Sequence, residues 1–163
     1  MRVVSVRLSS LLRGFNKMGG NPEVGSITVQ RLSPEAKIPT KSHTTDAGFD
    51  LYTDGDYVIG AGKTILISTG IAMAIPRGYA GLIWDRSSMG VKGLHRHAGV
   101  IDSDYRGEIK VCIHNASGDN YEISEGDRVA QLIIQAVPSF FLKEVDLVDG
   151  TDRGYKGFGS SGK

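Results

Sequence analysis

A series of short apolar runs, each closed by a turn signal, extends from Ser26 to Val145 and constrains the fold more than any other feature. Apolar residues that alternate with polar ones predict β-strands, and clusters of Gly, Asn, Asp and Ser between them predict tight turns. Only residues 87–89 are expected to begin a helix, which the following glycines keep short. The pattern predicts an all-β fold: a distorted jelly roll or β-barrel-like sandwich of many short strands with one short helix. The expected strands cover residues 27–30, 57–59, 64–68, 71–75, 79–84, 109–114, 129–136 and 140–145.

Length, charge and cysteine content limit the classes of function. The 163 residues suffice for one domain with a real core. Because 19 basic residues face 18 acidic ones, the net charge is +1, and no bulk field recruits nucleic acid or a membrane surface. Cys112 is the single cysteine, so no disulfide can form within the chain, which predicts an intracellular and most simply cytoplasmic location. No apolar run approaches the ~20 residues of a membrane helix.

The two ends of the chain differ from the middle. Residues 1–25 contain no acidic residue before Glu23, and their apolar residues fall on one side of a helical wheel. This N-terminal extension resembles an organelle transit peptide over residues 1–20; a disordered tail, or a start upstream of the true one with Met18 as the alternative, stays open as well. Residues 26–148 are expected to form the β-domain. Residues 149–163, rich in Gly and Ser, are expected to form a mobile C-terminal arm.

The stretch from Ala98 to Ile109 contains the first candidate functional residues. An apolar run with Gly99 leads into an acidic turn, and the chain leaves in an alternating strand. A β-hairpin of this kind can offer backbone N–H and C=O groups to a flat polar ligand, with the carboxylate of Asp102 and the ring of Tyr105 beside it. Alone, the stretch also fits an ordinary turn that the aspartates merely favour.

Other motifs are interpreted as structural. Residues 60–64 look like the end of a P-loop and residues 157–162 match the dinucleotide-binding glycine spacing, but neither is followed by a helix pattern. His95 and His97 are spaced to share a strand face and could bind a metal, but we expect no Cys or further His near them. The same structural interpretation covers His43, Trp84, Cys112 and His114.

Five separated stretches combine charged, hydroxyl and glycine residues. They are residues 47–52 (AGFDLY), 84–90 (WDRSSMG), 99–107 (GVIDSDYRG), 125–133 (EGDRVAQLI) and 153–162 (RGYKGFGSSG). In order and spacing they resemble the five motifs of the homotrimeric dUTPase family, from about residue 27 to residue 162. The resemblance implies a jelly-roll subunit, a homotrimer with shared active sites, and hydrolysis of dUTP to dUMP and pyrophosphate. This reaction limits uracil incorporation into DNA and supplies dUMP for thymidylate synthesis.

The resemblance also implies a role for each matching residue. Asp102 is implied as the general base that takes a proton from the attacking water. Asp50 is implied to orient that water and to contact the metal only through water, because Mg²⁺, the implied cofactor, is held mainly by the triphosphate. The implied phosphate ligands are Arg86, Ser87, Ser88, Gln131, Arg153, Ser160 and Ser161. The implied nucleoside ligands are Gly99, Val100, Ile101, Tyr105, Lys110, Phe158 and Gly159.

The chain departs from the family pattern at two positions. Many relatives have glycine where this chain has Ser88, and many have a uracil-side asparagine where it has Arg96, so it stays open whether Arg96 contacts the base. Two other functions stay open: a dCTP deaminase-like enzyme, since that family also uses an Arg-Ser-Ser stretch, and a regulatory protein that binds dUTP with little turnover. Ammonia release from dCTP, or dUTP binding without pyrophosphate release, distinguishes them. A viral origin stays open too.

Overall fold

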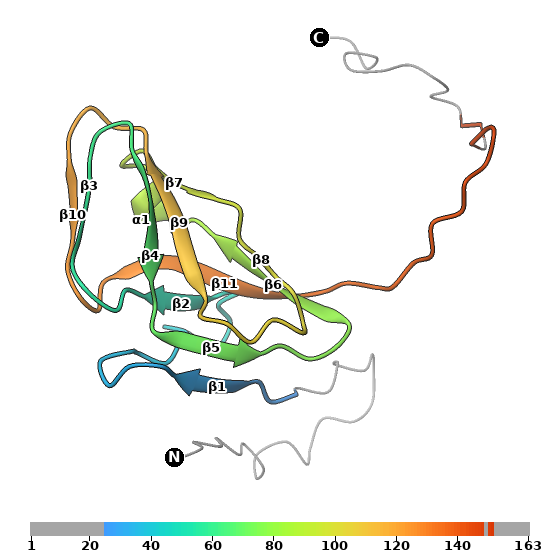
Figure 1. The fold of residues 1–163 in the computed structure, drawn as a ribbon, viewed down its shortest axis with the longest axis horizontal. Helices are drawn as coiled ribbons and strands as arrows, with labels where there is room; N and C mark the ends of the chain where they lie inside the picture. Colours follow the sequence, from blue (N-terminus) through green and yellow to red (C-terminus); the bar gives the residue numbers. More distant parts are fainter. Residues whose placement is uncertain (1–24, 149, 152–163) are drawn as a thin grey trace.

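The computed structural model describes residues 25–148, 150 and 151. In this part of the chain the expected strands between residues 27 and 136 are present to within two residues, together with strands at 49–52, 94–97 and 121–123 that were not among them. No helix among the described residues is long and apolar enough to cross a membrane. The elements, drawn in Figure 1, are β1 (Thr28–Arg31), β2 (Phe49–Tyr52), β3 (Tyr57–Ile59), β4 (Thr64–Ser68), β5 (Ile71–Ala74), β6 (Tyr79–Trp84), α1 (Ser87–Gly90), β7 (Leu94–His97), β8 (Val100–Ile101), β9 (Lys110–Asn115), β10 (Tyr121–Ile123) and β11 (Arg128–Ala136).

Two larger antiparallel sheets contribute to one hydrophobic core. The first has the strand order β2-β11-β6-β8 and the second has the order β4-β9-β7, while β1 pairs with β5 and β3 pairs with β10. Leu51 and Leu132 of the first sheet lie in one buried cluster with Ile67, Val111 and Ile113 of the second. The alternation in β9 places its apolar residues on this buried face, as predicted, because successive side chains of a strand point to opposite sides.

The turn that contains Asp102 joins two different sheets. β8 pairs with β6, and β9 pairs with β4 and β7, so the predicted hairpin is wrong in its pairing. The physical reason is that β9 finds longer partners on both of its sides, whereas β8 has only two residues. The connection from β3 to β4 at residues 60–63 is a turn, closed by the Lys63 N–H donating to the Gly60 carbonyl at 3.0 Å. No helix follows it, as expected of a structural turn.

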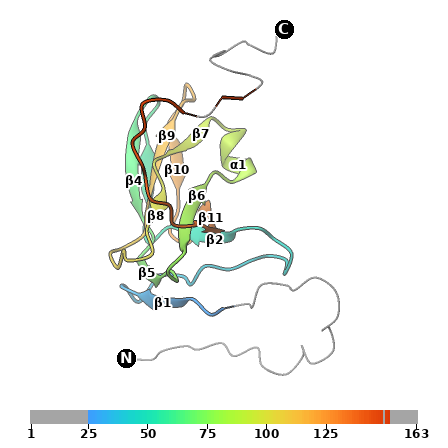
Figure 2. The same ribbon diagram turned by 90° about the vertical axis from the view of Figure 1, so that its right-hand side faces the viewer.

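After β11 the chain leaves the body of the domain, as Figures 1 and 2 show in orange and red. The Val137 N–H donates to the Gly78 carbonyl at 2.8 Å, and the following residues run away from the sheets. The expected strand at 140–145 is wrong for this chain by itself, because no neighbouring strand pairs with it. The side chains left exposed there are Phe140, Phe141, Leu142, Val145, Leu147 and Val148.

Candidate functional site

A polar cleft of about 410 Å³ lies where β2, β11 and the end of β6 meet α1. Five of the residues predicted to act at the site line this cleft, although they come from three separate stretches of the sequence. The lining residues are Ser42, Asp46, Ala47, Gly48, Asp50, Arg86, Ser87, Ser88 and Gln131. The strand order explains the convergence, because β11 pairs with β2 on one side and with β6 on the other.

Asp50 lies at the centre of the charged contacts in the cleft. Its Oδ1 accepts a hydrogen bond from Arg86 Nε at 2.8 Å, and its Oδ2 lies 3.2 Å from Nη1 of Arg128. The Asp50 side chain is only 14% exposed, so the two guanidinium groups neutralise a carboxylate that has lost most of its water. Asp50 therefore fixes the orientation of both arginines. Arg128 was not among the predicted site residues, and its place in the fourth motif, after the acidic turn, was the available signal.

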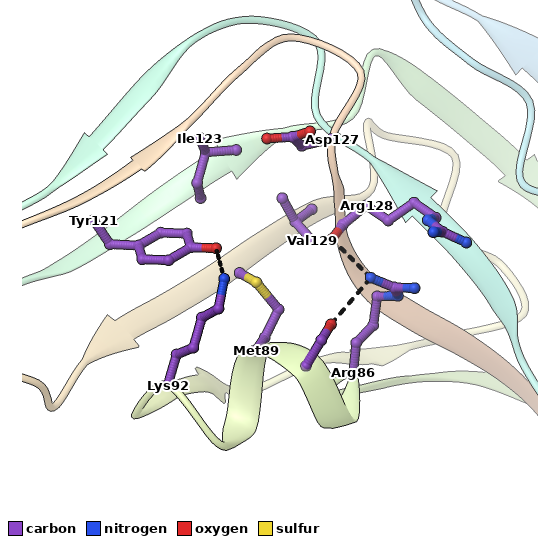
Figure 3. Close-up of a pocket in the computed structure, with 9 residues that line it drawn as sticks. Arg86, Met89, Lys92, Tyr121, Ile123, Asp127, Arg128 and Val129 are labelled. Atoms are coloured by element: carbon purple, nitrogen blue, oxygen red, sulfur yellow. Dashed lines mark hydrogen bonds between the residues drawn. The ribbon is translucent and has the colours of Figure 1, made fainter.

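Arg86 forms the wall between this cleft and a second, smaller pocket. Its Nη1 donates to Ser88 Oγ at 3.3 Å and to the Arg128 carbonyl at 3.4 Å. Figure 3 shows the second pocket, of about 210 Å³, where the Lys92 ammonium donates to the Tyr121 hydroxyl at 3.1 Å. Serine is a common helix cap, but in α1 Arg86 is the N-cap residue and no side chain caps the helix. Ser88 instead contacts the arginine.

Gln131 faces the cleft from the middle of β11. Its Nε2 donates to the Asp85 carbonyl at 2.9 Å, which uses one of its two amide hydrogens. A Cβ at Gly48 would lie only 2.8 Å from Gln131 Oε1, so glycine at that position makes room for the side chain. Gln131 is thus held between β2 and β6 with donor capacity left for a ligand.

Asp102 lies outside the cleft, in an exposed turn. The Tyr105 N–H donates to the Asp102 carbonyl at 3.2 Å, and Arg106 Nη1 donates to the carbonyls of Ser103 and Tyr105 at 2.8 Å each. The Tyr105 hydroxyl donates to the Glu108 carbonyl at 2.8 Å. These bonds give the turn a definite shape. Among the described residues, none forms a hydrogen bond or an ion pair with the Asp102 carboxylate.

Within one chain, Asp102 and Arg86 lie at opposite ends of β6. Ile101, which precedes Asp102, pairs with Gly81 near the start of β6, whereas Arg86 follows the end of that strand. Gly81 precedes Arg86 by five positions, so at a strand rise of about 3.3 Å per residue the backbones of Ile101 and Arg86 lie on the order of 15 Å apart.

Lys110 and Glu108 pair with each other beside this turn. Lys110 Nζ lies 3.2 Å from Glu108 Oε2, and the Gly70 N–H donates to Glu108 Oε1 at 2.9 Å. Burial opposes ionisation of Glu108, but the Gly70 N–H and the Lys110 ammonium outweigh it, so the pKa of the Glu108 carboxyl lies below its usual 4.5. The Gly70 hydrogen bond links the turn to the β4–β5 connection, and the ion pair gives Lys110 a structural partner.

We expect Glu108→Gln to lower the free energy of unfolding by about 1 kcal/mol at neutral pH, because the charge-assisted bonds are lost. Since the pKa of Glu108 is lowered by folding, its contribution is complete above pH 4.5 and is lost as the pH falls through the folded-state pKa. Urea unfolding from pH 7 to pH 3 measures this, and the difference between the two proteins should shrink below pH 4.5. Glu122→Gln, at an exposed position of β10, is the control. An equal loss in both variants, or a constant loss at all pH values, contradicts the prediction.

His95 and His97 each lie opposite another residue that can bind a metal, which their sequence neighbours do not indicate. His95 is opposite His114, and His97 is opposite Cys112, across the β7–β9 pair. The expectation of no neighbouring Cys or His is therefore wrong, because it depended on sequence separation rather than on register. Even so, the described part of the chain contains no group of three or more His, Cys, Asp or Glu side chains that could hold a metal ion.

The remaining predicted residues lie at the edge of the first sheet or outside the described residues. Gly99 adjoins β8, which consists of Val100 and Ile101 and lies at the edge of the first sheet. Arg153, Phe158, Gly159, Ser160 and Ser161, and the N-terminal segment 1–24, lie outside the described residues.

These features define an all-β protein with a cleft suited to a polyanion, because the Arg86 guanidinium group, three serine hydroxyls and the Gln131 amide line it, and Arg128 pairs with Asp50 beside it. The dUTPase family model matches residues 34–162, and the chain belongs to the dUTPase family. The deoxyuridine 5'-triphosphate nucleotidohydrolase of Candida albicans is 45% identical over 141 residues, which cover 85% of this chain and 89% of the relative. That of Corynebacterium glutamicum is 41% identical over 145 residues, covering 86% and 97%.

Solved structures give the same result for the fold. A mutant of the Staphylococcus bacteriophage 80alpha dUTPase with dUpNHpp superposes with a TM-score of 0.82 at 30% identity, covering 86% of this chain and all of that one. A dUTPase mutant from phage phi11 of S. aureus, which reveals the coordination of a structural Mg(II) ion, has a TM-score of 0.73 at 29% identity, covering 77% and 100%. The predicted jelly-roll-type fold is confirmed.

Proposed function

We propose that this protein hydrolyses dUTP to dUMP and pyrophosphate by attack of water on the α-phosphorus. The observation that carries the proposal is the cleft in which Asp50, Arg86, Ser87, Ser88 and Gln131 meet, because they belong to three motifs of the family. A triphosphate needs several placed donors, and a protein of net charge +1 must supply them locally.

The cleft would hold the phosphates. Arg86 presents a guanidinium group that Asp50 keeps in place, Ser87 and Ser88 present hydroxyls, and Gln131 presents an amide hydrogen. Donors fixed before the substrate arrives stabilise the charge that develops on the leaving pyrophosphate. From the C-terminal arm, residues 149–163, Arg153, Ser160 and Ser161 would add further phosphate contacts. The division of the chain that we propose therefore has three parts: an N-terminal extension (1–25), the β-domain (26–148) and this arm (149–163).

Asp102 would act as the general base. Its exposed carboxylate would take a proton from the water whose oxygen attacks the α-phosphorus, and the bond to the pyrophosphate oxygen would break. The role of Asp50 in orienting this water stays a prediction beside its observed pairing with two arginines.

The nucleoside would bind along the edge formed by Gly99, Val100 and Ile101, with Tyr105 below the deoxyribose. The backbone groups of an edge strand are available for such recognition. Phe158 and Gly159 of the C-terminal arm would cover the uracil. Lys110 is a weaker candidate for a nucleoside contact, since its ammonium pairs with Glu108.

We propose that three copies form the active enzyme and share its sites. Two features support an assembly: Asp102 and Arg86 of one chain lie toward opposite ends of β6, and the segment after β11 exposes Phe141 and Leu142 almost completely. A run of exposed apolar side chains of that size marks an interaction surface, and another copy of the chain is the partner we propose for it.

Mg²⁺ fits this proposal as a companion of the nucleotide. No cluster of three ligand side chains exists among the described residues, and the Asp50 carboxylate is already paired with two arginines. The donors of the cleft suit phosphate oxygens rather than a bare cation. When bound, the ion would neutralise charge on the triphosphate, which would supply most of its ligands together with water.

Cys112 as the single cysteine supports an intracellular site of action.

Pyrophosphate release from dUTP, dCTP, dTTP and UTP, each with and without Mg²⁺, tests the proposal. With Mg²⁺ present, we expect rapid pyrophosphate release from dUTP and from none of the other three nucleotides. Removal of the metal with EDTA should greatly lower the rate of release from dUTP. The extra methyl of dTTP, the reversed donor and acceptor pattern of dCTP and the 2′-hydroxyl of UTP should each exclude the analogue. Ammonia release from dCTP would assign the deaminase reaction instead, and binding of dUTP without pyrophosphate would assign a regulatory role.

A further inference from the structure

Arg96 points inward at the rim of the domain. In β7 it alternates with the exposed His95 and His97 and lies on the same face as Leu94, which is 1% exposed. An arginine on the inner face of a strand has to find polar partners within the protein. Its own N–H donates to Asp85 Oδ1 at 2.7 Å, which ties β7 to the end of β6.

The guanidinium group of Arg96 is used within the chain. Its carbon lies 4.8 Å from the centroid of the Trp84 ring, a cation–π contact, and Nη1 donates to the Ala98 carbonyl at 2.9 Å. Its Nε is buried and has no hydrogen-bond partner among the described residues. The side chain thus spans from β7 to Trp84 and holds the backbone just before β8.

The backbone that Arg96 holds is a strained corner. Ala98 has a φ of 58° and is the single non-glycine residue with positive φ in the described chain; Gly99 follows with a φ of 110°. Here the chain leaves the β4-β9-β7 sheet and joins β6 of the other sheet (Figure 1). The left-handed conformation is unfavourable for alanine, so neighbouring contacts have to maintain it.

The shape of this corner decides where β8 lies. The Ile83 N–H donates to the Gly99 carbonyl at 2.8 Å, and only two residue pairs then join β8 to β6. A Cβ at Gly99 would lie 2.9 Å from the Cβ of Ile83, so the backbone at Gly99 packs against Ile83 with no room for a side chain. Displacement of the corner would move the short strand, and the turn with Asp102 that follows it.

We propose that Arg96 is a positioning residue, which stacks on Trp84 and binds the Ala98 carbonyl to hold the left-handed corner that sets the nucleoside-binding edge. The inference rests on the proposed function, since that edge is where dUTP would bind. Arg96 acts through the backbone of residues 98–101 and not on the base. Lysine can replace it only in part, because an ammonium group lacks the planar fork that stacks and donates at once.

The test combines two substitutions and the intrinsic fluorescence of Trp84, the single tryptophan. Arg96→Met is expected to lower kcat/KM for dUTP about tenfold, which corresponds to the loss of one charged contact. Its Trp84 emission should change without nucleotide, because the stacked cation is gone. Arg96→Lys should fall between Arg96→Met and the wild type in both measurements, and it replaces Arg96→Met if that variant does not fold.

The decisive variant adds Ala98→Gly to Arg96→Met. Glycine adopts the corner conformation without strain, so the double variant should recover most of the kcat/KM while its fluorescence stays altered. Ala98→Gly alone should equal the wild type. A double variant as impaired as Arg96→Met would overturn the inference in favour of a direct contact with the base, and wild-type kcat/KM in Arg96→Met would overturn it outright. Absence of dUTP hydrolysis by the unmodified protein would instead refute the proposed function, while the fluorescence shift would still report the stack.

Discussion

Asp102→Asn is expected to lower kcat for dUTP at least ~10²-fold, because a positioned general base typically contributes ~10²–10⁴ to the rate. Asparagine has nearly the same shape but cannot accept the proton of the attacking water. The side chain is exposed, and no described residue hydrogen-bonds to its carboxylate, so the fold should be unchanged. The affinity for the non-hydrolysable analogue dUpNHpp should be equal or slightly higher, since one negative charge near the triphosphate is removed. Single-turnover kinetics and equilibrium binding measure the two effects separately.

Asp104→Asn is the matched control. Asp104 lies in the same turn and is also exposed, so the substitution removes the same charge two residues away. We expect its kcat to stay within about twofold of the wild type, because long-range charge effects between exposed groups are screened. Equal losses in the two variants would assign the effect to the net charge of the turn. Normal turnover by Asp102→Asn would remove Asp102 from the role of base.

The strands were predictable because their signal is local. Alternation in residues 109–114 fixed both the strand and its buried face, since side chains of a strand alternate between its two sides. The short length of the helix at residues 87–90 was predictable because Gly90 ends it and Gly93 follows closely. The motif residues were also predictable individually: Asp50, Arg86 and Gln131 do line one cleft.

The pairing of the strands was not predictable from local pattern. The local pattern predicts that the two strands flanking Asp102 pair with each other as a hairpin. Strand pairing, however, depends on segments that are distant in the sequence, and β9 pairs with β4 and β7 instead. The same limit explains the segment 140–145, whose apolar residues indicate a strand although none of the described strands pairs with it. The contacts of Asp50 with Arg86 and Arg128 likewise depend on β2 and β6 flanking β11.

Two inactive variants should restore activity when they assemble together. Asp102→Asn and Arg86→Ala each remove one group from the proposed site, but within one chain the two residues lie toward opposite ends of β6. If each site takes Asp102 from one copy and Arg86 from its neighbour, a randomly mixed assembly contains intact sites. With equal amounts, about one half of the first positions and one half of the second are unmodified, so about one quarter of the wild-type activity should return. Co-expression with two affinity tags, tandem purification and pyrophosphate release measure the recovery.

A second pair of variants makes the experiment specific. Gln131→Ala and Arg86→Ala alter residues that line the same cleft of the same chain, so every copy in that mixture carries one damaged cleft. No intact site can form, and the mixture should be no more active than the average of its two components. Recovery in the first mixture and not in the second would therefore assign Asp102 and the cleft to different copies. Equal failure of both mixtures, with each variant folded and mixed assemblies recovered, would mean that each chain brings Asp102 to its own cleft and would contradict the shared site.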